Sequence, residues 1–589
     1  MTAVAAPPER IRLADQREEV VAVAHFRLMV MMLMAIGVTI AIVGKLVWMA
    51  AVSDPGTGRR IYDGLTPPRA DIVDRNGVPL ARSIEGWAIG IHPREVMNNR
   101  AALAAKLAAL MPEHDRAWYL RKLASRRDFE YLRRRALPEL VREVNALGEP
   151  AIQLTREPER LYPQGAMAAQ AIGWVNDDGV GRLGIEQALD ARLSDPARLN
   201  QPVRLSIDSR VQAAVETALS NAMTAQSAEA ATGIVLDVRT GEILAMASLP
   251  NFNPNTPRNM PPPTLDEKGN PMPGADYNRA TNAVYELGST FKPITVANAI
   301  DSGVVTSMTK RYDARFPLQV GRYKIHDDHP QRRWLDVPET LVYSSNIVTA
   351  RIADDLGAER MQAMFRKLGF DRPAPIEIAA RGHPLFPSFW ARTTVMTTGF
   401  GHGIAVTPLH LANAYAALVN GGILRPATLL RRAPGQVPAG TRVFSESTSA
   451  QMRRLLRLVV TDGTGGKADA KGFRIGGKTG TADKTRAGGG YARNARVSTF
   501  ASAFPMDDPR YVVIAMLDDP KGNAQTYGIA TAGMVSAPVV GEIVQRIGPL
   551  LSIYPDESRD VDLDDLRALL WSPKKNAKKD ATADGKATH

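Results

Sequence analysis

The first regular feature of the chain is one long apolar run near its start. All residues from 28 to 52 are apolar except Thr39 and Lys45. About 20 consecutive apolar residues are enough for a helix to cross a bilayer, so the pattern predicts a membrane anchor over residues 28–52. A cleaved signal peptide is the alternative, because Ala51-Val52-Ser53 resembles a cleavage site. The apolar run is longer than a signal core, which favours the uncleaved anchor.

The residues before this run predict the orientation of the anchor. Residues 1–27 are polar and carry four arginines, and the chain after the run is far longer than the short loops that the positive-inside rule governs. We therefore expect a cytoplasmic N-terminal tail over 1–27, a single-pass protein of the inner (plasma) membrane, and a periplasmic or extracytoplasmic remainder.

Short strands and basic helices follow over residues 60–204, where we expect a mixed α/β pedestal domain. Asn76-Gly77 stands between two short apolar runs and predicts a hairpin turn. Helical patterns run from Asn99 to Met111 and from Arg116 to Leu147. No nucleophile, base or phosphate loop stands out here, so a scaffold or docking role is the default.

A second pattern of helices and strands predicts a larger α+β domain over residues 205–552. A loop rich in proline and asparagine, residues 251–277, interrupts it, and loops of that length are usually functional or mobile. Residues 553–589 turn acidic and then lysine-rich, which predicts a largely disordered tail. The predicted elements are helix Ser209–Met223, strands Thr232–Leu236 and Glu242–Ala247, strands Ser498–Phe504 and Tyr511–Leu517, and helix Met534–Ile547.

Composition narrows the possible partners. The 589 residues are 44% hydrophobic, which is ample for several buried cores. The formal charge is +12, from 73 basic and 61 acidic residues, but no long basic block lies outside the tail, so we expect no nucleic-acid partner. Cysteine is absent, which excludes disulfides and thiolate metal sites.

The clearest candidate chemistry is the pair Ser289 and Lys292 at the start of an apolar helical run. Residues three apart on a helix are surface neighbours, so the lysine amine can reach the serine hydroxyl. Burial would lower the lysine pKa and let it act as a base for the nucleophile. With Ser289 as N-cap, Pro293 would be the fourth helical residue, where its missing N–H costs nothing.

Two other serine–lysine pairs have the same spacing but lack a supporting helix. Ser307 and Lys310 follow a glycine and two valines, and Ser572 and Lys575 lie in the polar tail. The pattern is common in a chain of this length, so only the pair with an apolar helix behind it is retained.

Two further polar motifs follow the Ser289 helix. Ser344 and Asn346 begin another helical run, where a helix cap is the plainer interpretation. Lys478-Thr479-Gly480-Thr481 lies in a strand-like run, and its glycine marks a close approach of another backbone. Such an edge is suited to an extended peptide whose carboxylate meets the lysine and the hydroxyls.

Two remaining polar clusters give weaker evidence for a binding site. The glycine-dense residues 397–407 fit neither the Walker nor the dinucleotide pattern and read as turns. His326-Asp327-Asp328-His329 resembles a metal-ligand set, but no third ligand at helical or turn spacing supports it. We therefore expect no metal and no cofactor.

Three motifs remain: Ser289 with Lys292, Ser344 with Asn346, and Lys478-Thr479-Gly480. Their types and order match the signature of the penicillin-binding proteins and class A β-lactamases. The chain resembles a class B penicillin-binding protein, most closely the division-specific (FtsI-type) peptidoglycan D,D-transpeptidases, over nearly its whole length. The pedestal residues Arg69 to Gly77 and Gly184 to Glu186 add to the resemblance. Ala70 and Leu287 depart from it, because the family often has Gly and Pro there.

The resemblance implies a penicillin-binding fold, an antiparallel sheet flanked by helices, and an acyl-enzyme mechanism. It implies Ser289 as nucleophile, Lys292 as base, and Ser344 and Lys478 as the route of the proton to the leaving D-Ala. Asn346 would orient the substrate amide. Thr479, Gly480 and Thr481 would form the substrate-binding strand.

The implied partners are peptidoglycan stem peptides on the lipid-linked precursor and the nascent glycan, with β-lactams as covalent inhibitors. A glycosyltransferase of the shape, elongation, division and sporulation family, other division proteins and the membrane complete the expected set. The implied processes are cell wall biogenesis, septum formation and cell shape.

Several alternatives share part of this signature. A β-lactamase would need a water-activating carboxylate, and no Glu-x-x-Leu-Asn pattern follows Asn346. A bifunctional enzyme would need a glycosyltransferase domain, whose paired acidic motif residues 67–201 lack. An elongation-type transpeptidase of the lateral wall and a non-catalytic β-lactam sensor or division scaffold remain as alternatives.

Overall fold

The computed structural model describes residues 25–45, 68–263, 265, 269, 271–485 and 490–572 of two compact units, 1–65 and 66–589. In the first unit, His25–Lys45 forms one helix of 21 residues with a mean hydropathy of 2.3 and no buried residue in its apolar window. Its length and composition suit a membrane span, as predicted. Residues 1–24 and 46–52 of the predicted tail and anchor lie outside the described residues.

The second unit begins with a mixed sheet. Its strand order is β3-β2-β1-β5, with β4 also paired to β2. The hairpin predicted at Asn76-Gly77 is present, since Val73 pairs with Pro79 and Gly77 has a φ of +91°. The strands are β1 (Ile72–Val73), β2 (Pro79–Ile91), β3 (Glu130–Ala136), β4 (Ile152–Leu161) and β5 (Val203–Arg204).

The prediction of helix from Arg116 to Leu147 is wrong for the middle of that range, which forms a strand. The chain forms α3 (Arg116–Leu123), then β3, then α4 (Pro138–Asn145). Alternating charge suits a solvated helix face and a solvated strand equally, so the pattern could not separate them. Packing decides, because β3 pairs with β2 and Phe129 lies against Gly90, where a Cβ would come within 2.2 Å of the ring. Helix α2 (Arg100–Leu110) agrees with prediction.

Buried ion pairs hold together the domain that contains this mixed sheet. The Glu186 carboxylate accepts from Arg69 Nε at 3.0 Å and from Arg160 Nε at 2.7 Å, and all three side chains are almost fully buried. Glu186 lies on α6 (Gly184–Ala188), Arg160 on β4 and Arg69 just before β1. The contact therefore ties three distant segments to one carboxylate.

The larger domain is built on a five-stranded antiparallel sheet in the order β14-β15-β16-β6-β7. Every residue of β6 and β16 is buried, and both strands are largely apolar, with Thr232, Asp237 and Asp518 as exceptions. The strands are β6 (Ala230–Asp237), β7 (Ile243–Leu249), β14 (Gly476–Thr485), β15 (Tyr491–Phe504) and β16 (Tyr511–Asp518).

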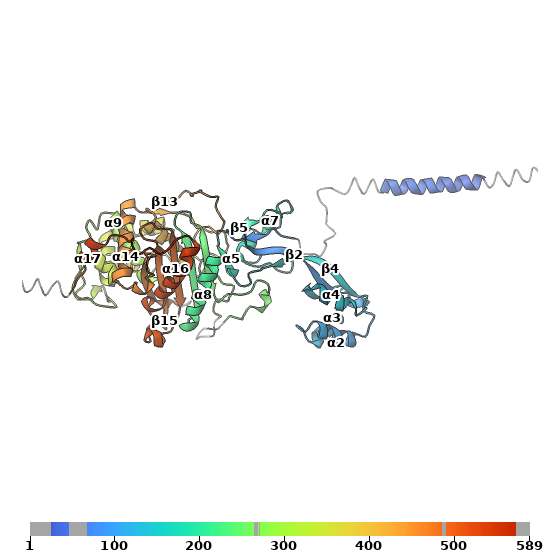
Figure 1. Ribbon diagram of the computed structural model, residues 1–589, viewed down its shortest axis with the longest axis horizontal. Coiled ribbons are helices and arrows are strands. Elements are labelled where there is room, and N and C mark those ends of the chain that lie inside the picture. The colour runs from blue at the N-terminus through green and yellow to red at the C-terminus, as the bar shows by residue number, and fades with distance from the viewer. Residues whose placement is uncertain are drawn as a thin grey trace, which may run out of the picture. The chain divides into compact units, whose positions relative to one another are not determined.

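Helices cover both faces of this sheet. Helices α8 (Ser209–Ala225) and α16 (Ala537–Leu550) pack on one face and against each other, and Figure 1 shows them side by side. Helix α13 (Pro408–Val419) packs on the other face against β6, β15 and β16. Along β16, Ile514 joins the α13 side and Val513 the α8 side, as strand alternation requires.

The remaining elements surround this core and place the three polar motifs. Within residues 251–277, the described part contains one short 3-10 turn, η3 (Pro257–Asn259). The others are α5 (Ala169–Ile172), α7 (Asp190–Leu193), α9 (Lys292–Asp301), β8 (Arg311–Asp313), β9 (Leu318–Val320), β10 (Tyr323–Ile325), β11 (Trp334–Asp336), α10 (Val337–Val342), α11 (Asn346–Lys367), α12 (Arg392–Gly399), β12 (Ile423–Leu424), β13 (Thr441–Arg442), α14 (Glu446–Asp462) and α15 (Ala532–Val535).

The C-terminal segment differs from the predicted tail. Asp564–Leu569 forms helix α17, and Leu563 and Leu566 are 2% exposed within the main core cluster. Polar composition suggested a solvated tail, but these two leucines bury the segment. Residues 573–589 lie outside the described part of the chain.

Candidate active site

Ser289 lies in a 3-10 turn, η4 (Gly288–Phe291), directly before helix α9. The predicted helix start is therefore displaced, because α9 begins at Lys292 and Pro293 is its second residue. The Lys292 N–H donates to the Ser289 carbonyl. The spacing predicted that the Lys292 amine reaches the Ser289 hydroxyl, but the described hydrogen bonds of this amine go to Ser344.

Glycines let this turn lie against strand β14. A Cβ on Gly480 would come within 2.5 Å of the Leu287 carbonyl oxygen, which explains the predicted close approach of backbones. Gly288 has a φ of +52°, and its Cβ would lie 3.1 Å from the Thr481 carbonyl oxygen. Ser289 is thus held beside the strand that carries Lys478, Thr479 and Thr481.

Ser344 lies between α10 and α11 and joins two lysines. Lys478 Nζ donates to Ser344 Oγ at 2.9 Å, and Lys292 Nζ donates to the same oxygen at 3.1 Å and to the Ser344 carbonyl. The cap of α11 falls on Ser345, whose Oγ accepts from Val348 N at 3.1 Å. Ser344 has a φ of +58°, a left-handed conformation that is uncommon for a residue with a side chain.

Both lysines are fully buried, which disfavours their charged forms. Burial lowers the pKa of Lys292 to about 7, against a smaller opposing effect of Asp327 and Asp328. Burial and the positive charge of Lys292 lower the pKa of Lys478 well below its ordinary value. A neutral amine is therefore available as a proton acceptor near neutral pH.

The remaining predicted site residues are fixed by the surrounding chain. Thr479 Oγ1 accepts from Lys478 Nζ at 3.1 Å and lies 2.9 Å from Thr464 Oγ1. Thr481 Oγ1 accepts from the Ala532 N–H at 3.0 Å. Among the described strands, β14 pairs only with β15, so no described strand occupies its other edge.

The loop that resembled a metal site has a different task. Asp327 is 7% exposed, and its carboxylate accepts from Ser345 Oγ at 2.8 Å and from Ile347 N at 2.9 Å. Asn346 Nδ2 donates to the His326 carbonyl at 2.9 Å. Across the residues that the structure describes, no group of three His, Asp or Glu side chains could hold a metal. Sequence reasoning noticed Asp327 but missed its role as the anchor of the Ser344 loop.

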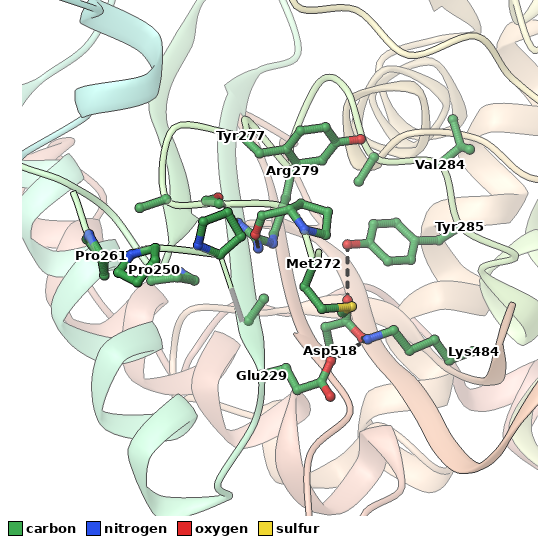
Figure 2. A pocket seen from close by; sticks show the side chains of 17 residues that line it. Glu229, Pro250, Pro261, Met272, Tyr277, Arg279, Val284, Tyr285, Lys484 and Asp518 are labelled. Carbon is green, nitrogen blue, oxygen red and sulfur yellow. Dashed lines mark hydrogen bonds and ion pairs between the residues drawn. The ribbon is translucent and has the colours of Figure 1, made fainter. Parts of the chain in front are cut away.

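A pocket of about 480 Å³ borders the segment that leads to Ser289 (Figure 2). Tyr285 Oη donates to Asp518 Oδ2 at 3.3 Å, and Lys484 Nζ lies 2.8 Å from Asp518 Oδ1. Burial raises the pKa of both Asp518 and Tyr285. These contacts, which the sequence did not reveal, tie the segment before Ser289 to the ends of β14 and β16.

Two family models match this architecture. The penicillin binding protein transpeptidase domain matches residues 231–545, more than half of the chain, and the penicillin-binding protein dimerisation domain matches residues 65–197. The chain belongs to the class B penicillin-binding proteins. The predicted family and fold class are confirmed: an apolar N-terminal helix, a mixed pedestal and an antiparallel sheet flanked by helices.

This class B penicillin-binding protein aligns with its relatives over most of their length. The probable peptidoglycan D,D-transpeptidase FtsI of Caulobacter vibrioides is 40% identical, over 86% of this chain and 85% of the relative. FtsI of Escherichia coli K12 is 30% identical, over 87% and 90%. A crystal structure of penicillin binding protein 3 from Mycobacterium tuberculosis superposes with a TM-score of 0.63 at 25% identity, covering 84% of this chain and 98% of that one.

The anchoring role of Asp327 can be measured against its neighbour. We expect Asp327→Ala to lower the free energy of unfolding by about 1–3 kcal/mol, because it strands a buried hydroxyl and a buried amide. The control is Asp328→Ala, since Asp328 is exposed. Thermal unfolding of the two variants is the measurement, and equal melting temperatures would show that Asp327 holds nothing.

Proposed function

We propose that this protein is a membrane-anchored peptidoglycan D,D-transpeptidase that cross-links stem peptides of the septal wall through an acyl-enzyme on Ser289. The observation that carries the proposal is the convergence of two buried lysines on Ser344 Oγ, beside the turn of the nucleophile. The peptidoglycan D,D-transpeptidases among its relatives supply the substrate class.

The acylation step follows from this arrangement. Lys292, neutral near pH 7, accepts the proton of Ser289 Oγ while that oxygen attacks the carbonyl carbon of the penultimate D-Ala. The C–N bond to the terminal D-Ala then breaks. The leaving amine takes a proton routed through Ser344 Oγ, which accepts hydrogen bonds from both lysines. Backbone amides of Ser289 and Thr481 would stabilise the oxyanion.

The open edge of β14 suits the donor peptide. An extended stem peptide would add to this edge as a strand, with its terminal carboxylate at Lys478, Thr479 and Thr481. Gly480 allows the strand to lie against the nucleophile's turn. Asn346, whose amide is oriented by the His326 carbonyl, would hold the substrate amide.

The second half of the reaction transfers the acyl group to an amine. An amine of a neighbouring stem attacks the Ser289 ester, forms the new amide and releases the serine oxygen, which recovers its proton. A β-lactam resembles the D-Ala-D-Ala end and would stop at the acyl-enzyme. The M. tuberculosis relative was solved in complex with aztreonam and with ampicillin, which supports β-lactams as inhibitors here.

The septal role and the partners rest on the relatives and on the apolar helix. Several relatives are FtsI proteins, whereas another is the stage V sporulation protein D of Bacillus subtilis. The names of the relatives therefore point to more than one cellular role within the family. We place the N-terminus in the cytoplasm and the catalytic domain outside the membrane. The partners we propose are a glycosyltransferase of the shape, elongation, division and sporulation family and other division proteins.

Labelling with a fluorescent penicillin tests the nucleophile. We expect the full-length protein to take up one stable label, and Ser289→Ala to take up none, because that variant lacks the proposed nucleophilic oxygen that would form the ester. Ser307→Ala is the matched control, since Ser307 has the same spacing to a lysine but is exposed. Label that persists in Ser289→Ala, or leaves the unmodified protein within seconds, contradicts the proposal.

The depressed pKa of Lys292 predicts how acylation depends on pH. Below pH 7 Lys292 is mostly protonated and cannot accept the serine proton, and above pH 7 it is mostly neutral. The second-order rate constant for acylation by a penicillin should therefore rise about tenfold from pH 6 to pH 8. A flat profile would mean that Lys292 is not the base, and Lys292→Arg, which stays charged, should abolish the rise.

Localisation separates the septal from the lateral-wall alternative. A fluorescent fusion of the full chain should gather at midcell in dividing cells, and depletion should give filaments with unfinished septa. Even distribution along the lateral wall, with rounded cells on depletion, would favour the elongation-type role. A scaffold role would predict that the Ser289→Ala protein restores division as well as the unmodified one.

A further inference from the structure

The ordered C-terminal segment, residues 556–571, is fixed along helix α14, and we call it the C-terminal strap. Arg457 Nη2 pairs with Asp560 Oδ2 at 2.7 Å, and Arg567 Nε pairs with Asp462 Oδ2 at 3.0 Å. Arg454 Nε donates to the Asp562 carbonyl at 2.9 Å. Since α14 also packs against β14, these contacts fix the strap to the helix behind the substrate-binding strand.

The strap also belongs to the hydrophobic core. Leu563 and Leu566 are each 2% exposed and lie in the same cluster as Leu341 of α10 and Ile347 of α11. These two helices flank Ser344 on both sides. Helix α17 of the strap packs against α10, the helix that directly precedes Tyr343 and Ser344.

The last residue of the strap, Trp571, contacts helix α10. The Trp571 N–H donates to Glu339 Oε1 at 2.9 Å, while Glu339 Oε2 accepts from Arg333 Nη1 at 2.7 Å. The Arg333 guanidinium carbon lies 5.3 Å from the centroid of the Trp571 ring and 5.4 Å from that of Tyr343. One cation is thus held between an indole, a phenol ring and a buried carboxylate, a set of contacts that favours a single position.

This stack acts on the residue next to the reacting group. Tyr343 directly precedes Ser344, whose φ of +58° persists only where the surroundings hold the backbone. Ser344 Oγ must also stay within 2.9 Å of Lys478 Nζ and 3.1 Å of Lys292 Nζ. A mobile Tyr343 ring would loosen the peptide that satisfies both distances.

We propose that the C-terminal strap positions Ser344 for proton transfer, with Trp571 and Arg333 as positioning residues that act through Tyr343. The inference rests on the proposed function, since it assigns the strap to the proton route of that reaction. Trp571 is 44% exposed, so removing its indole leaves no buried cavity and separates positioning from stability.

The test compares Trp571→Ala with Trp571→Phe in the full-length protein, using a penicillin as probe and separating binding from the rate constant of acylation. Trp571→Ala should slow acylation on the order of tenfold with binding changed less than about twofold, because only geometry in the transition state is lost. Trp571→Phe keeps an aromatic face and should restore the rate to within about twofold.

Two controls complete the design. Tyr554→Ala removes an exposed aromatic side chain just before the strap, and a stop codon after Ser572 removes only the residues that follow it; both should acylate like the unmodified protein. Melting temperatures should stay within about 3 °C for all variants.

Three outcomes would overturn the inference. Trp571→Ala acylates at the unmodified rate, or Trp571→Phe is impaired as much as Trp571→Ala, or affinity and melting temperature fall together with the rate, which a merely structural role would produce. Failure of the proposed function has a different signature, because the unmodified protein would then take up no label on Ser289.

Discussion

The site depends on the burial of two amines around one hydroxyl. Lys292 and Lys478 are both fully buried and both donate to Ser344 Oγ, so desolvation and mutual repulsion disfavour charge on the pair. A lysine amine can therefore be neutral, and able to accept a proton from a serine, near neutral pH. Burying such groups costs folding free energy. The large hydrophobic cores on both faces of the sheet offset this cost.

Close backbone packing brings the three motifs together. The turn of Ser289 lies against β14 because Gly480 and Gly288 leave room for the neighbouring carbonyl oxygens. The Ser344 loop is fixed on one side by Asp327 and on the other by the stack of Tyr343, Arg333 and Trp571. Each motif is thus held by residues outside it. This division suits a site whose geometry must tolerate little movement.

Particular elements show how far sequence patterns reach. Four strands of the large sheet and helix α8 were predictable, because apolar runs and turn signals leave few alternatives. The polar strand β14 was only indicated as a strand-like run, and the first half of β15 was not predicted. The segment from Arg116 to Leu147 was not, since alternating charge suits helix and strand alike and pairing of β3 with β2 decides. Polar composition misled for residues 553–572, where Leu563 and Leu566 outweigh their charged neighbours.

The sequence by itself determined the chemistry of the site: a serine and a lysine three apart, a second serine with an amide, and a lysine beside hydroxyls on a strand. Residue type and local spacing are properties of the chain, so they can be read directly. Only the tertiary structure decided that Ser289 precedes the α-helix in a 3-10 turn, that Asp327 anchors a loop, and that Trp571 returns to α10. These contacts join residues far apart in the chain, and their partners are chosen by packing and burial, which no local pattern records.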